Sequence, residues 1–106
     1  MRRGTTPVHT FKPKSKATGE ALDLRSAAVV YLTYKQDGQI KVEKTKDEME
    51  ITEDRVRVKL SQQDTLSFST IGDVEIQFRV RYPDGSAPAS KVLKTPVAKI
   101  LKEGMI

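Results

Sequence analysis

A strict alternation of apolar with charged or polar side chains constrains the fold of this chain more than any other feature. Between residues 73 and 82 the apolar positions are Val74, Ile76, Phe78, Val80 and Tyr82. Successive side chains of a β-strand point to opposite faces, so this period of two predicts a strand with one buried and one solvated face. Burying such side chains is worth roughly 1.5–3 kcal/mol each, and we expect this strand to anchor the core.

Shorter β-forming stretches, separated by turn signals, occupy most of the remaining chain. The expected strands cover residues 6–11, 28–35, 40–44, 49–51, 55–60 and 92–97. Asp37-Gly38 is the strongest hairpin signal, because glycine adopts the positive φ that a type I′ turn requires. Both faces of residues 28–35 are apolar, which indicates a central strand. Pro7 and Pro96 cannot donate a ladder hydrogen bond and therefore favour edge positions for the first and last strands.

Two short helical turns complete the expected secondary structure. The Asp23 carboxylate can cap a turn over residues 24–26, and Ser61 and Asp64 have the spacing of a capping box. One shared core is expected from Val56, Val58, Leu60, Leu66, Phe68, Val74, Ile76, Phe78 and Val80. The prediction is an all-β single domain, a compact antiparallel Ig-like β-sandwich of about seven short strands. Residues 1–16 are expected to form a basic N-terminal arm that includes an edge strand, and residues 17–106 the sandwich body.

The composition excludes several classes of function. The chain has no cysteine and a single histidine, His9, so it offers no disulfide framework and no cysteine or multi-histidine metal site. It has no glycine-rich phosphate loop or calcium loop, and its acid pairs are sequence neighbours in turns rather than a spaced catalytic pair. We therefore expect no enzyme activity, no cofactor and no small-molecule substrate. His9 is expected to be either hydrogen-bonded or solvent-facing on its edge strand.

The sequence also predicts where the protein is made. Its longest apolar run, residues 27–32, is far shorter than the ~20 residues that a membrane span needs. No apolar stretch follows Met1 in the manner of a signal peptide. We expect synthesis in the cytoplasm and no membrane partner.

The net charge of +5 is concentrated at one end of the sequence. Residues 1–16 contain five basic residues and no acid, whereas the basic and acidic residues of 17–106 balance. The five candidates for partner binding are Arg2, Arg3, Lys12, Lys14 and Lys16. They could form a solvated terminus, dock on an acidic neighbouring subunit or follow nucleic-acid phosphates. We do not expect nucleic acid, because the body adds no basic excess to extend such a footprint.

A second basic surface depends on which strands are neighbours. Its candidate residues are Arg55, Arg57, Lys59, Arg79 and Arg81, which form one patch only if their two strands lie side by side. Cross-strand pairs with nearby glutamates could neutralise this patch and leave an ordinary soluble sheet face. Tyr31 is the candidate platform for a sugar, although the chain contains no tryptophan.

The chain resembles a family of small proteins encoded in prophages of Gram-positive gut bacteria. The resemblance lies in the start RGTTPVHTF at residues 3–11, VKLSQQDTLSF at residues 58–68 and VEIQFRV at residues 74–80. Their layout is similar to the N-terminal domain of phage baseplate upper proteins, in which a β-sandwich mediates attachment within a tail. The resemblance implies a virion protein of the tail or baseplate whose partners are other phage structural proteins and further copies of itself. The alternative is a small β-sandwich module that binds carbohydrate or nucleic acid.

Overall fold

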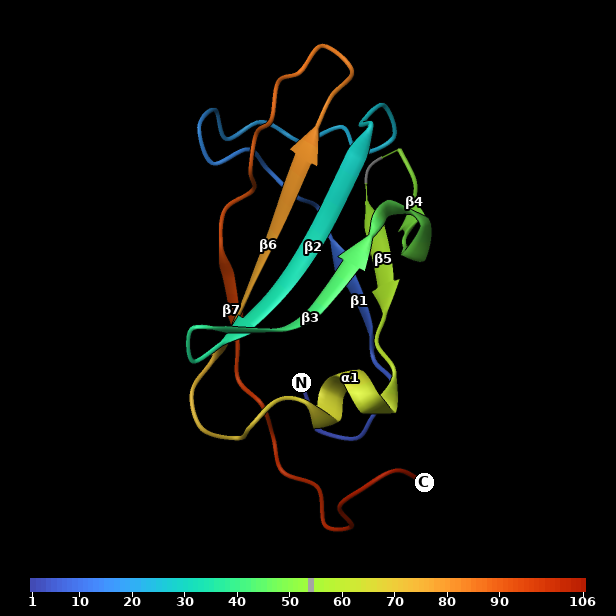
Figure 1. Cartoon of the computed structure of the whole chain (residues 1–106), viewed down its shortest axis with the longest axis vertical. Coiled ribbons are helices and arrows are strands. Elements are labelled where there is room, and N and C mark those ends of the chain that lie inside the picture. The colour runs from blue at the N-terminus through green and yellow to red at the C-terminus, as the bar shows by residue number, and fades with distance from the viewer. Residues whose placement is uncertain (54) are drawn as a thin grey trace.

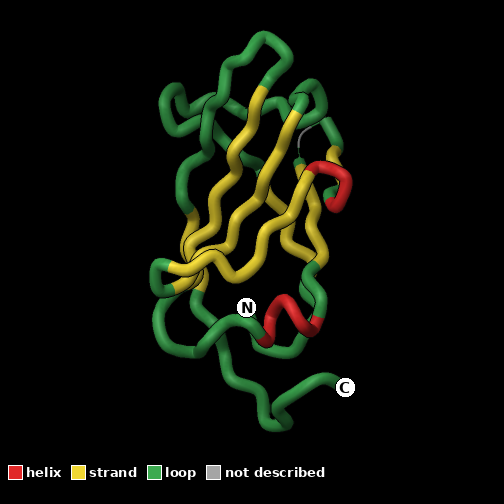
Figure 2. Tube along the Cα trace, in the orientation of Figure 1, coloured by secondary structure: helices red, strands yellow, loops and turns green. Residues whose placement is uncertain are grey.

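A computed structural model describes residues 1–53 and 55–106 as two antiparallel β-sheets packed against each other (Figures 1 and 2). The three-stranded sheet has the order β1-β5-β4, with β1 at Val8–Phe11, β4 at Glu50–Ile51 and β5 at Val56–Lys59. The four-stranded sheet has the order β3-β2-β6-β7, with β2 at Val29–Gln36, β3 at Gln39–Thr45, β6 at Val74–Arg81 and β7 at Leu93–Thr95. A short 3-10 helix, η1 (Lys46–Glu48), and a short α-helix, α1 (Gln62–Leu66), lie in the connections. The predicted all-β sandwich is confirmed.

Strand β2 is the centre of the larger sheet, as its two apolar faces predict. It pairs with β6 along its whole length, from Val29↔Arg81 to Gln36↔Val74. It pairs with β3 over a shorter stretch, from Tyr31↔Thr45 to Gln36↔Gln39. The tight turn between β2 and β3 contains Asp37 at φ 56° and Gly38 at φ 75°, which are the left-handed conformations of a type I′ hairpin.

The core lies between the sheets and follows the predicted alternation. Eight of the nine expected residues are buried, and Leu66 is the exception because it is only half-buried. The five-residue helix α1 directs Thr65 inward in its place, where the Thr65 hydroxyl donates to the carbonyl of Thr5 at 2.8 Å. Phe11 packs edge-on against Phe78, with ring centroids 5.3 Å apart, and thereby joins the two sheets.

The two predicted helical turns have different outcomes. Ser61 and Asp64 form the expected capping box at the start of α1, each side chain accepting from the backbone of the other residue. Asp23 does accept from the amides of Arg25 and Ser26, but the segment is a bend and no helix forms there. A local Asx turn satisfies the same amides as a helix cap, so capping chemistry alone does not decide between them. The predicted hairpin over residues 49–60 is present as β4 and β5, and Asp54 in its turn lies outside the described residues.

The first sixteen residues are part of the sandwich rather than a free arm. Strand β1 is an edge strand, as predicted, and it pairs with β5 from Val8↔Lys59 to Phe11↔Val56. Before β1, Arg2 forms a parallel bridge with Ala98, and after β1, Ser15 forms an antiparallel bridge with Ser90. Much of the backbone of residues 2–16 is therefore paired within the chain, and its exposed side chains remain for a contact with another molecule.

Candidate functional site

The five basic residues of the N-terminal segment do not gather at one site. Arg2 and Arg3 lie at the end of the molecule that holds the C-terminal segment, where Arg3 pairs with Glu103 at 2.8 Å. Lys12, Lys14 and Lys16 lie in the segment after β1, which runs toward the opposite end of a molecule 47 Å long (Figure 1). Since β1 separates the two groups, they act as two weaker charge clusters instead of one basic arm.

The second predicted basic patch does not form either. Arg57 and Lys59 lie on β5, whereas Arg79 and Arg81 lie on β6, and these strands belong to different sheets. The exposed side chains of the two sheets face away from each other, so the five cations cannot share a surface. Arg57 lies opposite Glu50 and forms an ion pair with it at 3.9 Å, which partly neutralises its own face.

His9 is hydrogen-bonded between the sheets. Its Nδ1 lies 2.8 Å from the hydroxyl of Tyr34, a side chain with no exposed surface, and its ring contacts Phe11 edge-on. Of the two expected states, the structure has the hydrogen-bonded one. Burial, with a smaller contribution from the charged N-terminus, lowers the pKa of His9 below its ordinary value. The partly buried imidazole is therefore neutral at pH 7, and the tautomer decides whether its Nδ1 accepts from or donates to the Tyr34 hydroxyl. No serine completes a nucleophilic pair with it among the described residues.

A charged pair lies close to the Tyr34 hydroxyl. Asp64 and Lys44 form an ion pair at 2.9 Å. Burial is the main cause of the raised pKa of Tyr34, and the negative charge of Asp64 raises that pKa further. Burial alone would raise the pKa of Asp64, but hydrogen bonds from the Ser61 amide and from Lys44 outweigh it and lower that pKa. Asp64 and Lys44 thus have structural roles at the start of α1 and beside the buried Tyr34.

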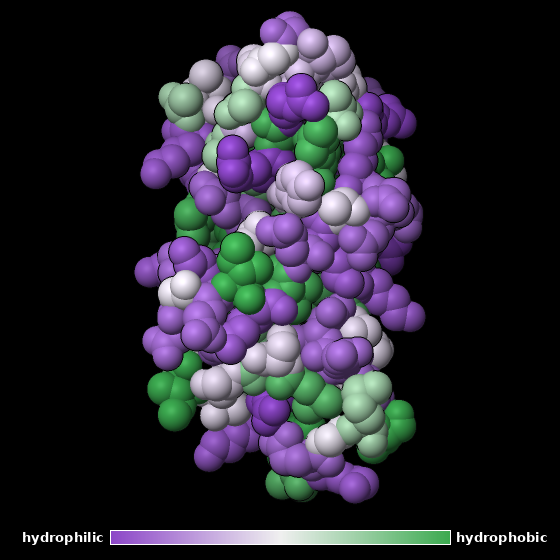
Figure 3. Space-filling model, viewed as in Figure 1, coloured by the Kyte–Doolittle hydropathy of each residue, from purple (hydrophilic) through white to green (hydrophobic). Residues whose placement is uncertain are grey.

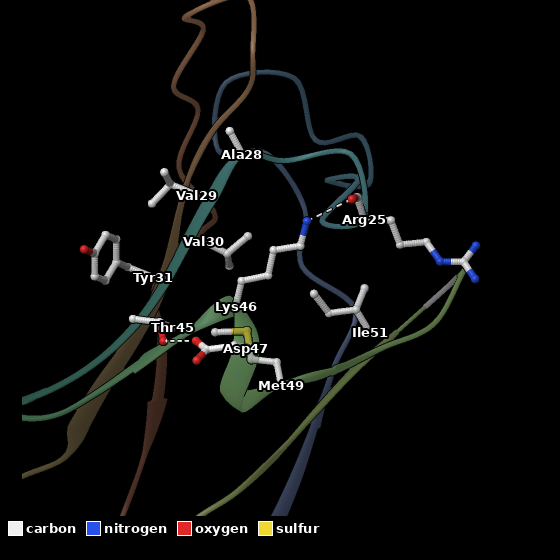
Figure 4. A pocket seen from close by; sticks show the side chains of 10 residues that line it. All are labelled: Arg25, Ala28, Val29, Val30, Tyr31, Thr45, Lys46, Asp47, Met49 and Ile51. Carbon is white, nitrogen blue, oxygen red and sulfur yellow. Dashed lines mark hydrogen bonds between the residues drawn. The ribbon is translucent and has the colours of Figure 1, made fainter.

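A groove at the edge of β2, the strand-edge groove, opens where the β2–β3 ladder ends (Figure 4). It has a volume of about 740 Å³. The lining residues come from β2, η1, β4 and their connections: Arg25, Ala28, Val29, Val30, Tyr31, Thr45, Lys46, Asp47, Met49 and Ile51. In Figure 4, Val29 and Tyr31 project from one face of β2, and Val30 projects from the other. The groove thus runs across the edge of a strand rather than over a flat sheet face.

Local geometry at the groove follows from how β3 ends. Thr45 is the N-cap residue of η1 and forms a capping box with Glu48, in which the Thr45 backbone amide donates to the Glu48 carboxylate at 3.0 Å. The chain turns away in η1, so no β3 residue lies opposite Val29 and Val30. Lys46 reaches back along the gap and donates to the carbonyls of Arg25 at 2.9 Å and Ala27 at 2.7 Å.

A second, shallower hollow lies on the outer face of the four-stranded sheet. It is about 430 Å³ in volume and is lined by Tyr31, Thr33, Lys35, Ile40, Glu43, Gln77 and Arg79. Tyr31 is 42% exposed and lines both hollows, so it stands between the strand-edge groove and the sheet face. Figure 3 shows that hydrophobic groups on this side of the molecule form separate patches between hydrophilic side chains.

The described residues bring together no recognisable catalytic or metal-binding group. Among residues 1–53 and 55–106, no three of the histidine, aspartate and glutamate side chains gather to hold a metal ion. Neither helix in this part of the chain has the length or apolar character to cross a bilayer. The strand-edge groove was missed at the level of sequence. Two sequence features could have indicated this groove: the apolar Val29 beside the core residue Val30, and Tyr31, which was the candidate sugar platform.

No protein-family model, curated protein or solved structure matches this chain.

Proposed function

We propose that this chain is a non-enzymatic structural protein of a phage or prophage virion. It acts in the assembly of a tail or baseplate through its strand edges and its basic N-terminal residues, and its partners are other phage structural proteins and further copies of itself. The observation that carries the proposal is a set of apolar side chains left in solvent on β7 and on the segment that follows it. Leu93, Leu101, Met105 and Ile106 are exposed by 50%, 108%, 63% and 86%. Contact with a neighbouring subunit would bury this surface and lower its free energy.

The charge of the N-terminal segment supports the same role. Lys12, Lys14 and Lys16 form no ion pair with any carboxylate among the described residues. Exposed cations of this kind steer a subunit toward an acidic neighbour and make the encounter sensitive to salt. The resemblance of residues 3–11 and 58–68 to prophage proteins, and of the layout to the baseplate upper protein domain, indicates which assembly is meant.

The experiment is mass spectrometry of particles purified after prophage induction in a host that carries the gene. The protein is expected in the particle fraction at a constant ratio to the major capsid protein. A variant with Leu101→Ser, Met105→Ser and Ile106→Ser should enter particles less efficiently with an unchanged melting temperature. Ile71→Ser is the matched control, because Ile71 is also exposed, by 84%, but lies in the loop before β6. A protein that is abundant in the lysate and missing from the particles would exclude the virion role.

A carbohydrate-binding module is the second candidate, and one observation favours it. Tyr31 stands exposed in the hollow of the outer sheet face beside Gln77 and Arg79. An aromatic ring can stack on the apolar face of a sugar while planar polar groups bind its hydroxyls. A glycan array with the native protein and a Tyr31→Ala variant tests this role. Binding that disappears in the variant would support it, and a blank array for the native protein would speak against it.

A further inference from the structure

The three-stranded sheet is one strand short of the sheet that packs against it. The 3-10 helix η1 joins the end of β3 directly to β4, so these two edge strands lie on the same side of the sandwich. The other two edge strands, β1 and β7, therefore form the opposite side (Figure 1). Val42 on β3 is buried, which shows that the inner face of β3 is covered. The missing strand therefore belongs on the β1 side.

Leu93 on β7 marks the surface that this missing strand would cover. It lies directly opposite Ile76 in the β6–β7 pair, and directly opposed residues carry their side chains on the same face of a sheet. Ile76 faces the core and is 5% exposed, whereas Leu93 is 50% exposed. The inner face of the larger sheet is thus apolar but uncovered at β7.

The outer edge of β1 has free backbone groups. The Leu60 amide donates to the Pro7 carbonyl at 3.0 Å, so Val8↔Lys59 is a non-hydrogen-bonded pair of the β1–β5 ladder. Backbone groups alternate along a strand, and Val8 and Thr10 therefore direct their N–H and C=O groups away from β5. Neither residue has a hydrogen-bond partner on that side among residues 1–53 and 55–106, and both are exposed.

The chain itself closes both ends of this open edge. Arg2 bridges to Ala98 before β1, and Ser15 bridges to Ser90 after it. The open stretch is therefore about as long as β1, which has four residues. An added strand of this length gains few main-chain hydrogen bonds, so its side chains must supply much of the affinity and the specificity.

The charges beside this edge favour carboxylates on the added strand. Lys59 and Arg57 lie opposite Val8 and Thr10 in the β1–β5 pair, and their longer side chains can extend past these two toward the edge. Lys12 follows β1 directly. Neither Lys59 nor Lys12 pairs with a carboxylate within the described part of the chain. An added strand therefore meets positive charge on its outer face and the apolar surface of β7 on its inner face.

We propose that an extended segment of a partner protein adds antiparallel to the outer edge of β1 and completes the smaller sheet with a fourth strand. Carboxylates alternate with apolar side chains in this segment, so that the carboxylates meet Lys59 and Lys12 and the apolar groups cover Leu93. The antiparallel direction follows the other strand pairs of the fold. The inference rests on the proposed assembly role, and it names the chemistry of the neighbouring subunit that this role requires.

The probe is a capped peptide of three Glu-Val repeats, added to the native protein labelled with nitrogen-15 for NMR. The Val8 and Thr10 amides should exchange quickly with solvent in the free protein, because they have no partner, and should become protected when the peptide is added. Salt should weaken this binding. A peptide of three Lys-Val repeats is the matched control and should not bind. Unchanged exchange at both amides in millimolar Glu-Val peptide would overturn the proposal.

N-methylated peptides test the backbone contact itself. In an antiparallel pair, the peptide residues that bond to Val8 and Thr10 carry their side chains on the same face as these two, so they are the glutamates. Methylation of the glutamate amides should abolish binding, and methylation of the valine amides should preserve it. Equal loss with either peptide would refute addition as a strand. Thr10→Pro is the reciprocal variant, because proline is tolerated where an edge N–H points to solvent, and it should lose binding with an unchanged melting temperature.

Charge variants test the recognition of carboxylates. Lys12→Gln with Lys59→Gln should weaken binding of the Glu-Val peptide by roughly two- to thirtyfold, the range for two exposed ion pairs. Lys35→Gln with Lys102→Gln is the matched control, because these exposed lysines lie on β2 and in the C-terminal segment, and it should leave the affinity unchanged. The same loss in both double variants would contradict a carboxylate contact at β1.

Two further outcomes identify the occupant and separate this inference from the assembly role. Protection of the Val8 and Thr10 amides that rises with protein concentration in the absence of peptide would identify a second copy as the occupant and overturn the partner segment. A protein that enters particles but does not bind the peptide retains the assembly role and loses the added strand. A protein that binds the peptide and is missing from particles shows the reverse.

Discussion

Replacing His9 by Phe should destabilise the fold more than replacing both His9 and Tyr34 by Phe. The Tyr34 hydroxyl lies 2.8 Å from His9 Nδ1, and the Tyr34 side chain has no exposed surface. His9→Phe removes the hydrogen-bond partner and leaves a buried hydroxyl without one, which costs about 1–3 kcal/mol. Removing the hydroxyl as well replaces both polar partners by apolar groups, a change that can be nearly neutral. The double variant should therefore regain most of the loss.

Urea unfolding followed by far-ultraviolet circular dichroism measures the effect on the native chain, the two single variants and the double variant. A difference of 1 kcal/mol in the free energy of unfolding shifts the melting temperature of a domain of about this size by roughly 4–8 °C, so thermal scans can verify the order. Tyr31→Phe is the control, because its hydroxyl is on an exposed side chain, and it should change little. Losses that simply add in the double variant would show that the two side chains are not coupled, and the hydrogen bond would be refuted.

Three further predictions concern the core and its response to pH. Phe78→Ala should cost about 3–5 kcal/mol in urea unfolding, because Phe78 is buried against Phe11; an unchanged unfolding midpoint would contradict its place in the core. Gln36→Leu should lower the free energy of unfolding by about 1–3 kcal/mol, since the buried Gln36 side-chain amide donates to Ser69 O at 2.8 Å and accepts from Ser69 N at 2.8 Å. Faster hydrogen exchange at the Ser69 backbone amide in this variant would verify the contact. Burial and the N-terminal charge lower the pKa of His9 below 6.5, so the unfolded chain binds the proton first as pH falls. The free energy of unfolding should therefore decrease as the pH falls from 6.5 to the pKa of His9 in the folded protein, and this group should cause no change above pH 6.5. If the same pH dependence survives in His9→Phe, it belongs to another group.

Much of the fold was predictable because its signals are local. The alternation from Val74 to Val80 defines β6 and its inner face without knowledge of any partner strand. Asp37-Gly38 places the β2–β3 turn, and Ser61 with Asp64 places the start of α1. Each of these signals acts between residues a few positions apart, where sterics and capping hydrogen bonds dominate.

The errors arose where a local signal had more than one solution. Asp23 satisfies its amides in a bend as well as it would at a helix. Leu66 continues an apolar pattern, but the change of period in α1 makes Thr65 the buried residue. The basic surfaces failed for a different reason, since a sequence contains cations without the partner strands that group or separate them.

The sequence by itself determined the all-β class, most strand positions, the inner faces and the tight turns, because these follow from side-chain alternation and turn chemistry over short distances. Only the tertiary structure decided that β5 and β6 lie in different sheets, which separates Arg57 from Arg79. It also decided that the segments before and after β1 run toward opposite ends of the molecule and that the β2–β3 ladder stops short of Val30. These features depend on contacts between segments distant in the chain, and their geometry is set by how two twisted sheets close over one core.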